Sequence, residues 1–354
     1  MDKKIPAVSV IVPLYNAENF IEQCLQSLLD QTFKDFEALV IDDASTDRSV
    51  EIVERMSERF DGRLSLIRRE KNSGGIVAIP RNIGLGMARG DFIMFVDNDD
   101  FLMPTALEHL YKIAVETDAD VLNSSVFGRL DGDEPVKKIS FERRQPVDKP
   151  TLLDDNLAQR VNDFINFRFH FNVWTKFFRR RFLVENEIRF PELPASDDMF
   201  FSFYCLMRAK RYVRIPNPFY VWRVRDDSVS HEELSPEDAV RKWITIIVEG
   251  TAQLERFMAR TPFFEQSPSA RFAILHKLIN DQLHYLQPQY FSTPTFKMNE
   301  LIRAELARHS TDTTTLLGYV INTLNIVRIQ LHNEQKRNMQ LTQQLAQQSK
   351  EATK

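Results

Sequence analysis

The stretch DFIMFVDNDD, residues 91–100, contains five consecutive apolar side chains followed by four polar ones, three of which are carboxylates. An uninterrupted apolar run is expected of a strand that is buried on both faces of a parallel sheet. Open α/β sheets bind their ligands at the carboxyl ends of such strands. The polar residues 97–100 are therefore predicted to lie at a ligand site.

The segments around this stretch alternate between strand and helix patterns. Apolar side chains at helical spacing predict helices over about 17–31, 45–59 and 80–89, and another that begins near Pro104. Strands are predicted at VSVIVP (8–13), FEALVID (36–42), LSLIRR (64–69), DFIMFVD (91–97) and ADVLNSS (119–125). Such alternation requires crossover connections, so we expect an α/β fold with a doubly wound, mostly parallel sheet.

The rest of the chain is less regular and then becomes helical. Residues 126–234 predict a surface loop or short hairpin, two helices, a strand around 172–178 and a strand pair over about 212–225. From Ser235 only helix patterns occur, with breaks expected at Pro262, Pro268, Pro288 and Pro294. We therefore expect a catalytic domain over 1–234 (a nucleotide-binding half, 1–125, and an acceptor half, 126–234), a helical extension over 235–311 and a helical tail over 312–354.

Composition excludes several classes of protein. The 354 residues carry a net charge of −4, which disfavours a nucleic-acid-binding protein. Two cysteines, Cys24 and Cys205, are too few for a disulfide scaffold and fit a reducing compartment. The first residues contain no signal-peptide core, and the longest apolar candidate, 316–327, is too short to span a bilayer. These features predict a cytoplasmic protein, with peripheral contact at the inner face of the membrane as the alternative.

The three carboxylates of the 97–100 stretch predict a cation site. Closely packed carboxylates repel one another unless a cation lies among them. Oxygen ligands alone suit Mg²⁺ or Mn²⁺, which commonly bridge to substrate phosphates. The alternative is that Asp99 or Asp100 caps the helix near Pro104, but capping accounts for only one of the three carboxylates.

A second acidic cluster, Asp42-Asp43-Ala44-Ser45-Thr46-Asp47, follows the second predicted strand. A carboxylate there can accept hydrogen bonds from a base or a ribose, and Asp43 is the candidate. Ser45 and Asp47 are at least as well explained as helix caps. No GxGxxG sequence follows the first strand and no Walker A sequence occurs, which argues against a dinucleotide enzyme and a P-loop ATPase.

Four collinear motifs occur in the first hundred residues. They are VSVIVPLYNAENFIEQCLQSLLDQTF (8–33), VIDDASTD (40–47), the Gly74-Gly75 to Arg81-Asn82 segment, and ARGDFIMFVDNDD (88–100). Their order and spacing make the chain similar to glycosyltransferase family 2. Looser similarity continues through NVWTKFFRRRFL (172–183), ASDDMFF (195–201) and YVWRVRDDSVSH (220–231). The resemblance implies a GT-A fold, a nucleoside-diphosphate sugar donor, a divalent metal and transfer with inversion.

The resemblance also implies roles for individual residues on the donor side. It places Asp43 on the uracil, Arg81 near the diphosphate and Asp100 toward the donor sugar. Asp97 and Asp99 would form the Asp-x-Asp element that holds the metal and the ribose-diphosphate. The remaining donor-side residues implied are Pro13, Tyr15, Asn16 and Asn98.

An inverting displacement also needs a base that deprotonates the acceptor hydroxyl. The family pattern places this base in a Glu-Asp pair before a helix, and the matching pair here is Asp197-Asp198. Asp198 is the predicted base, and Asp197 stands where the family has Glu. We expect Ser196 to cap the helix and the helix N-terminus to keep Asp198 ionised. The alternative is that both aspartates serve only the helix end.

Three further sets of residues are implied with weaker support. Arg223 and Arg225, on one face of a predicted strand, would contact the diphosphate, and His231 would bind metal or phosphate, unless this is a solvated strand face. Trp174 and Lys176 would lie on the acceptor side, although core packing also explains Trp174. The run Arg179-Arg180-Arg181 would meet an anionic acceptor or lipid heads, or simply begin an exposed helix.

The sequence therefore predicts an inverting sugar transferase that uses a UDP-sugar, with a saccharide or a lipid-linked glycan as acceptor, in surface polysaccharide synthesis. A sugar-phosphate nucleotidyltransferase is one alternative, but LYNAEN (14–19) lacks the basic, Gly-rich loop expected there. A non-catalytic scaffold with this fold is another. Apolar side chains at helical spacing beyond about residue 312 predict a homo-oligomer, with an interfacial membrane helix as the alternative.

Overall fold

The computed structural model describes residues 5–132, 134–139, 147–225, 234–309, 336–337 and 339. The chain divides into two compact units, Met1–Glu233 with Gly250–Lys277, and Leu234–Glu249 with Leu278–Lys354. The middle of the expected helical extension thus belongs to the first unit. His231 and nearly all of the 312–354 tail lie outside the described residues, as does the oligomer contact predicted there.

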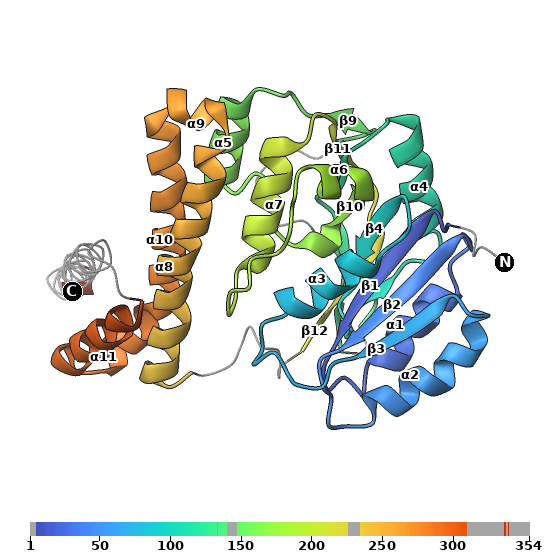
Figure 1. Ribbon diagram of the computed structural model, residues 1–354, viewed down its shortest axis with the longest axis horizontal. Helices are drawn as coiled ribbons and strands as arrows, with labels where there is room; N and C mark the ends of the chain where they lie inside the picture. The colour runs from blue at the N-terminus through green and yellow to red at the C-terminus, as the bar shows by residue number, and fades with distance from the viewer. Residues whose placement is uncertain are drawn as a thin grey trace, which may run out of the picture. The chain divides into compact units, whose positions relative to one another are not determined.

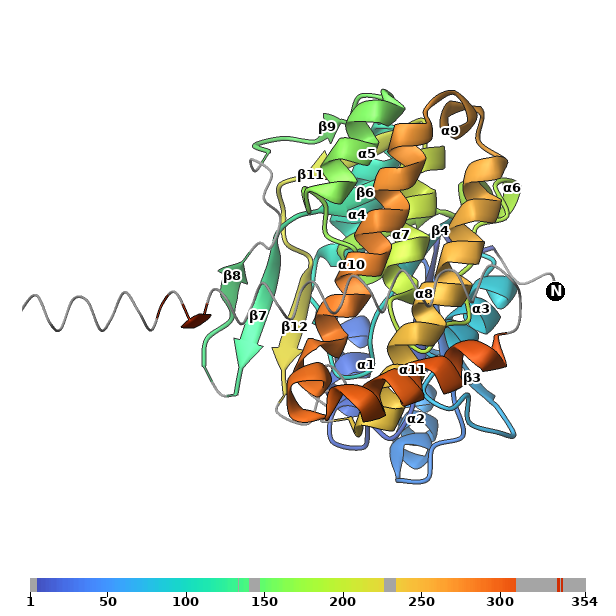
Figure 2. The same ribbon diagram turned by 90° about the vertical axis from the view of Figure 1, so that its left-hand side faces the viewer.

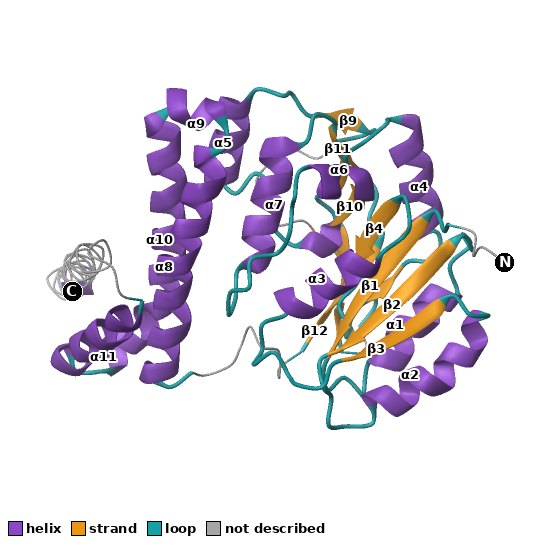
Figure 3. Cartoon of the chain, viewed as in Figure 1, coloured by secondary structure: helices purple, strands orange, loops and turns teal. Residues whose placement is uncertain are grey.

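The first unit is built on an eight-stranded sheet (Figures 1 and 3). Parallel pairing joins β1 to β2 and β4, β2 to β3, and β6 to β11, whereas β10 runs antiparallel to both of its neighbours. The mostly parallel sheet predicted from the apolar runs is confirmed. In spatial order the strands are β3 (Leu64–Arg68), β2 (Phe36–Asp42), β1 (Val8–Leu14), β4 (Phe92–Phe95), β10 (Lys176–Arg179), β6 (Val121–Ser124), β11 (Tyr212–Ile215) and β9 (Thr151–Leu152).

A smaller sheet of four strands lies in the same unit, and Figure 2 shows three of them, β7, β8 and β12, side by side. Its order is β5 (Phe101–Leu102), β12 (Tyr220–Val224), β7 (Phe127–Asp131) and β8 (Lys137–Ile139). The predicted strand pair over 212–225 is therefore wrong, because β11 and β12 belong to different sheets. β12 pairs instead with β5, directly after the acidic stretch 97–100.

Alternation along β1 divides the helices between the two faces of the larger sheet. Val8, Val10 and Val12 share an apolar cluster with residues of α1 (Ile21–Leu29), α2 (Ser49–Ser57) and α4 (Ala106–Glu116). On the other face, Ile11 lies against Gly84 of α3 (Ala78–Met87). β1 is therefore covered on both faces, as its continuous apolar sequence requires. The remaining helices up to residue 208 are η1 (Glu58–Phe60), α5 (Leu157–Ile165), η2 (Val173–Thr175), α6 (Arg180–Glu185) and α7 (Asp197–Arg208).

The C-terminal helices are α8 (Pro236–Ala259), α9 (Pro262–Gln266), α10 (Pro268–Ser292) and α11 (Thr295–Arg308). Three of them begin at a proline, where the missing N–H costs nothing. The break predicted at Pro288 is wrong, because α10 continues through it, flanked by helix on both sides. In the first unit, Tyr204 of α7 stacks on Phe257 with 4.5 Å between ring centroids.

The second unit has an apolar core of its own. It is formed by one face of α8 together with residues of α10 and α11, and Trp243 of α8 stacks on Tyr285 of α10. No helix in the described part of the chain is both long and apolar enough to cross a bilayer. The buried members of this core are Ala239, Val240, Ile244, Ile247, Leu283, Leu286, Met298, Ile302 and Leu306.

The contact between α3 and β1 predicts opposite effects of alanine at two glycines of one helix. A Cβ on Gly84 would lie 2.4 Å from Cγ2 of Ile11, whereas a Cβ on Gly86 meets nothing within 4 Å. Alanine gains about 1 kcal/mol of helix propensity, and overpacking a core costs about 1–3 kcal/mol. We expect Gly84→Ala to lower the melting temperature and Gly86→Ala to raise it in thermal unfolding. Equal shifts for both variants would show that this packing is not tight.

Candidate active site

The predicted donor-side residues gather at the carboxyl ends of β1, β2 and β4. Asn98 donates from Nδ2 to the carbonyl oxygen of Pro13 over 3.0 Å, which joins the acidic stretch to the end of β1. The backbone N–H of Asp43 donates to the carbonyl of Leu14 over 2.8 Å. Asn16, with φ 44°, accepts from the N–H of Thr46 over 2.8 Å. Three separate sequence motifs therefore form one continuous surface, with the side chain of Tyr15 exposed beside it.

The Asp43 carboxylate is held by the loop that follows β3. It accepts hydrogen bonds from the N–H of Ser73 at 3.0 Å and from Nδ2 of Asn72 at 3.2 Å, and it pairs with Arg69. Sequence analysis missed these partners. The available signal was the pair Gly74-Gly75, whose φ values of 73° and 86° let the loop turn back over Asp43.

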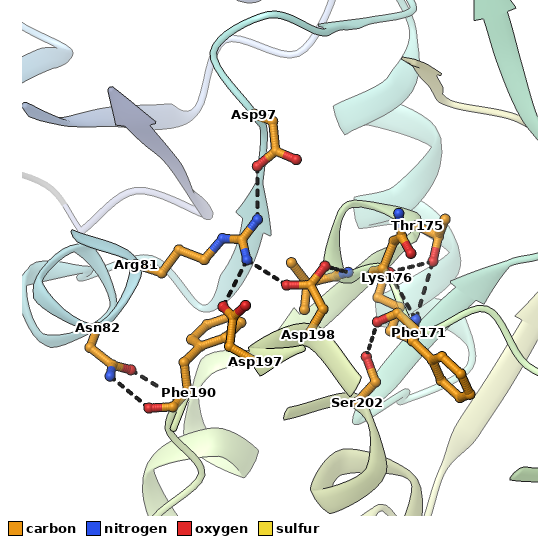
Figure 4. Close-up of polar contacts among 12 residues, drawn as sticks. Arg81, Asn82, Asp97, Phe171, Thr175, Lys176, Phe190, Asp197, Asp198 and Ser202 are labelled. Atoms are coloured by element: carbon orange, nitrogen blue, oxygen red, sulfur yellow. Dashed lines mark hydrogen bonds and ion pairs between the residues drawn. The ribbon is translucent and has the colours of Figure 1, made fainter. Parts of the chain in front are cut away.

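A single buried guanidinium joins three carboxylates from distant parts of the chain (Figure 4). Arg81 of α3 donates from Nη2 to Oδ1 of Asp97 over 2.9 Å and from Nη1 to Oδ2 of Asp197 over 3.0 Å. The same Nη1 also pairs with Oδ1 of Asp198. Only 5% of the Arg81 side chain is exposed, and the ring of Phe190 lies 5.4 Å from its guanidinium carbon. The structure thus brings Arg81 to the predicted base as well as to the predicted donor side.

Burial controls the protonation of this cluster. Burial alone would lower the pKa of Arg81, but the three carboxylates, Asp198 foremost, raise it, so the guanidinium stays charged. Burial raises the pKa of Asp197 to about 7 despite the opposing charge of Arg81, and it also raises the pKa of Asp198. Burial therefore opposes the ionisation that the helix N-terminus is expected to favour at Asp198. Ser196 precedes α7 with φ 64° and makes no side-chain cap.

The loop before β10 fixes the other side of Asp198. The N–H of Val173 donates to Oδ2 of Asp198 over 3.2 Å. Lys176 is fully buried, and its ammonium donates to the carbonyls of His170 at 2.6 Å and Asn172 at 2.9 Å. Lys176 therefore holds the loop that positions Asp198, a role that its expected place on the acceptor side does not suggest.

The predicted acceptor residue Trp174 is also buried, and Tyr220, which packs against it, connects it to the acidic stretch 97–100. Its ring stacks on Tyr220 with 4.6 Å between centroids. The Tyr220 hydroxyl donates to Oδ2 of Asp100 over 2.7 Å and accepts from the N–H of Asp97 over 3.1 Å. Asp100 is 2% exposed, and its other oxygen accepts from the N–H of Arg223 over 2.8 Å. In this structure Asp100 supports the loop, and Tyr220 is a site residue that sequence analysis missed.

The two predicted diphosphate arginines contact the same loop. Arg223 donates from Nε to the carbonyl of Asp99 over 2.9 Å, and Nη1 of Arg225 lies 3.0 Å from Oδ2 of Asp99. Both guanidiniums lie over the ring of Phe20, at 5.4 and 4.7 Å from its centroid. β12 therefore supplies cationic groups to the acidic stretch that follows β4.

Asp97 and Asp99 have the chemistry that a divalent cation requires. Their side chains are 29% and 27% exposed, so a cation has access to both. Burial raises the pKa of Asp99, and the charge of Asp97 raises it further, a penalty that a bound cation would relieve. Within the described ranges no three acidic, histidine or cysteine side chains are arranged to hold a metal ion. Mg²⁺ commonly uses one or two carboxylates and completes its shell with phosphate oxygens and water, so the pair fits such an ion.

Proteins similar to this chain fall in one class. The family model described as glycosyl transferase family 2 matches residues 9–186, half of the chain. The Bacillus subtilis glycosyltransferase EpsJ is 29% identical, with the match covering 66% of this chain and 65% of EpsJ. Poly(ribitol-phosphate) beta-N-acetylglucosaminyltransferase TarS of Staphylococcus aureus is 32% identical, with the match covering 68% of this chain and 40% of TarS. The chain thus spans less than two thirds of either relative.

One solved structure covers nearly the whole chain. The crystal structure of S. aureus TarS 1-349 in complex with UDP-GlcNAc aligns with a TM-score of 0.55 and 25% sequence identity. The alignment covers 89% of this chain and 90% of that one. Together with the family match, it confirms the predicted GT-A fold with a C-terminal helical region.

The raised pKa of Asp197 predicts a pH-dependent effect of Asp197→Asn. Because the folded-state pKa of about 7 exceeds the usual value, the folded protein binds the extra proton between about pH 4 and 7. Wild-type stability from this group therefore falls as pH rises through that window. Asparagine mimics the protonated acid, so we expect the melting temperature of the variant, relative to wild type, to increase from about pH 4.5 to about pH 8.

Asp47→Asn provides a control of opposite sign. Burial raises the pKa of Asp47, but hydrogen bonds from Ser49 and from the N–H of Glu18 outweigh it, so the net pKa is lowered. This group stabilises the fold above its unfolded-state pKa, and the stabilisation is lost in acid. The melting temperature of Asp47→Asn relative to wild type should decrease as pH rises. A pH-independent difference for Asp197→Asn would contradict the proposed protonation.

Proposed function

Since the chain belongs to glycosyltransferase family 2, we propose that it transfers a sugar from a UDP-sugar, with inversion, to a hydroxyl group of a saccharide or lipid-linked glycan. The observation that carries this proposal is the contact of Arg81 with Asp97 on the donor side and with Asp198 on the acceptor side. A glycosyltransferase needs both sides within reach of one anomeric carbon. Neither the nucleotidyltransferase nor the scaffold alternative accounts for a base placed there.

The donor proposal is supported by the nucleotide-side geometry and by a relative. TarS was crystallised with UDP-GlcNAc, and in this chain Tyr15, Asn16 and Asp43 lie at the carboxyl ends of β1 and β2. Asp43 would accept a hydrogen bond from the uracil N–H, since a carboxylate has lone pairs for several donors. The names of the relatives support an acceptor in bacterial surface polysaccharide synthesis. We propose that class for this chain and leave the donor sugar unspecified.

Asp97 and Asp99 are the residues that would hold Mn²⁺ or Mg²⁺ together with the diphosphate. A bound divalent ion neutralises the charge that develops on the departing UDP. Arg223 and Arg225 already lie against Asp99 and carry charge of the sign that a diphosphate requires. The chain thus supplies both anionic and cationic groups at the point where the glycosidic bond breaks.

Asp198 would act as the general base that deprotonates the acceptor hydroxyl. The acceptor hydroxyl oxygen attacks the anomeric carbon as the bond to the UDP oxygen breaks, and the hydroxyl proton passes to the Asp198 carboxylate. The Asp198 side chain is 22% exposed, whereas that of Asp197 is 7% exposed, so Asp198 is the one with access to a substrate. Arg81 and the N–H of Val173 fix the orientation of its carboxylate.

The metal assignment predicts the outcome of Asp99→Asn. The amide is a neutral and weaker ligand for a hard cation, so we expect loss of transfer and of Mn²⁺-dependent UDP binding in titration calorimetry. Asp61→Asn is the matched control, because Asp61 is exposed, has φ 52°, which asparagine tolerates, and lies at the end of η1. Unchanged Mn²⁺-dependent affinity for UDP in Asp99→Asn would overturn the assignment.

The base assignment predicts a different pattern for Asp198→Asn. Loss of a general base typically costs about 10²–10⁴-fold in rate, so transfer should fall by that amount while calorimetric UDP binding is retained. Asp197→Asn keeps the contact with Arg81 and should lose less transfer than Asp198→Asn. A parallel loss of UDP binding and rate in Asp198→Asn would indicate a purely structural role.

A further inference from the structure

A cavity of about 850 Å³ lies at the amino end of β4, the strand whose carboxyl end leads into the candidate active site. It is found where β4 begins and β10 ends, since Phe92 and Arg179 are paired in register and both line it. The acidic stretch follows the other end of β4, and Lys176 begins β10 near Asp198. Nothing in the proposed transfer reaction uses this cavity.

Cations in the cavity wall outnumber the carboxylates that can neutralise them. Two carboxylates, Asp118 and Glu185, form ion pairs with Arg179 and Arg181. A third, Asp120, accepts the backbone N–H groups of residues 210 and 211 at 2.9 and 3.0 Å. The remaining lining cations are Arg180, Arg208 and Lys210, and the remaining carboxylate is the exposed Asp91.

These three cations have no carboxylate partner among the residues that the structure describes. Arg180 donates from Nε to the carbonyl of Gly90 over 3.0 Å. Arg208 donates to the carbonyl of Arg260 over 3.1 Å, and burial together with the nearby Arg260 charge lowers the pKa of Arg208. Within the described residues, Arg180 and Arg208 thus contact backbone carbonyls and no carboxylate, so their charges are available to an anionic ligand.

Apolar side chains complete the lining. Val115 and Val184 are 53% and 58% exposed, and both line the cavity. Phe92 and Tyr111 lie in the same wall with their rings 5.8 Å apart. The cavity therefore offers cationic groups for an anion and apolar surface for the carbon atoms that carry it.

We propose that this cavity binds a phosphodiester-bearing chain, with phosphate groups on Arg180, Arg208 and Lys210 and the linking carbons on Val115 and Val184. Guanidinium groups match phosphate oxygens in a planar, two-bond geometry. A volume of about 850 Å³ exceeds what one phosphate group occupies and accommodates a short chain segment.

A lipid surface fits this cavity less well than a phosphodiester chain does. Membrane-binding surfaces present their cations outward to the headgroups. Here the cations line a hollow together with Phe92 and Phe182, whose exposed fractions are 3% and 5%. The cavity would hold a long glycoconjugate at a distance from the reacting hydroxyl. That use rests on the proposed function, whereas the binding itself does not.

The test measures binding of a fluorescently labelled oligo(glycerol phosphate) to the full chain by anisotropy, with UDP and Mn²⁺ at saturation to block the donor site. The double variant Arg180→Gln/Lys210→Gln removes two unpaired cations and should weaken binding at least tenfold. Lys112→Gln is the matched control, since Lys112 is exposed on α4, pairs with Glu116 and does not line the cavity. Its affinity should stay within twofold of wild type.

Two further measurements make each outcome decisive. Donor hydrolysis should be unchanged in the double variant, because no substituted residue lies at the candidate active site, and a single cooperative thermal transition should show that the variant is folded. Binding that is equally strong in wild type and double variant overturns the proposal. So does selective binding to phosphatidylglycerol vesicles without binding to the oligomer, which would identify a membrane surface. If wild type and both variants all lack donor hydrolysis while wild type still binds the oligo(glycerol phosphate), only the proposed transfer reaction is contradicted.

Discussion

The arrangement of the candidate site depends on one buried guanidinium. Three carboxylates removed from water would repel one another at a cost of several kcal/mol without a cation among them, and an isolated buried arginine would be equally unfavourable. Arg81 satisfies Asp97, Asp197 and Asp198 together. Because these groups follow β4 and begin α7 while Arg81 lies on α3, the cluster fixes three elements relative to one another. Burial, with a smaller contribution from the charge of Asp198, raises the pKa of Asp197 to about 7 despite the opposing charge of Arg81.

Other carboxylates around the site are also paired with arginines. Asp99 lies against Arg225, and Asp43 lies against Arg69. In each pair the carboxylate follows a strand of the larger sheet and the cation comes from a segment far along the chain or from the following loop. The strand ends supply anionic groups, and the surrounding segments compensate for their burial. In the proposed reaction, a divalent ion and a diphosphate would take the place of these contacts with charges of the opposite sign.

Much of this architecture was predictable because it depends on local patterns. Continuous apolar runs identify β1, β2 and β4 as buried parallel strands, and their carboxyl ends then locate Asp43 and the 97–100 stretch. The partners of Arg81 were not predictable, because 116 positions separate it from Asp197 and only the folded chain brings them together. The burial of a single side chain also cannot be predicted from one sequence. Lys176 is a residue type that often binds substrates, yet its ammonium is buried and donates to backbone carbonyls.

The aspartate at position 197, where the family has glutamate, becomes intelligible from this geometry. A base must touch the acceptor, and the greater exposure belongs to Asp198. Asp197 points to the buried Nη1 of Arg81, 3.0 Å away, and needs only enough length to reach it. Because the guanidinium extends from α3 toward the start of α7, the shorter carboxylate suffices, and the loss of one methylene leaves the charge balance of the cluster unchanged. The constraint at this position is thus a side-chain oxygen that accepts the hydrogen bond from Arg81, and side-chain length is secondary to it.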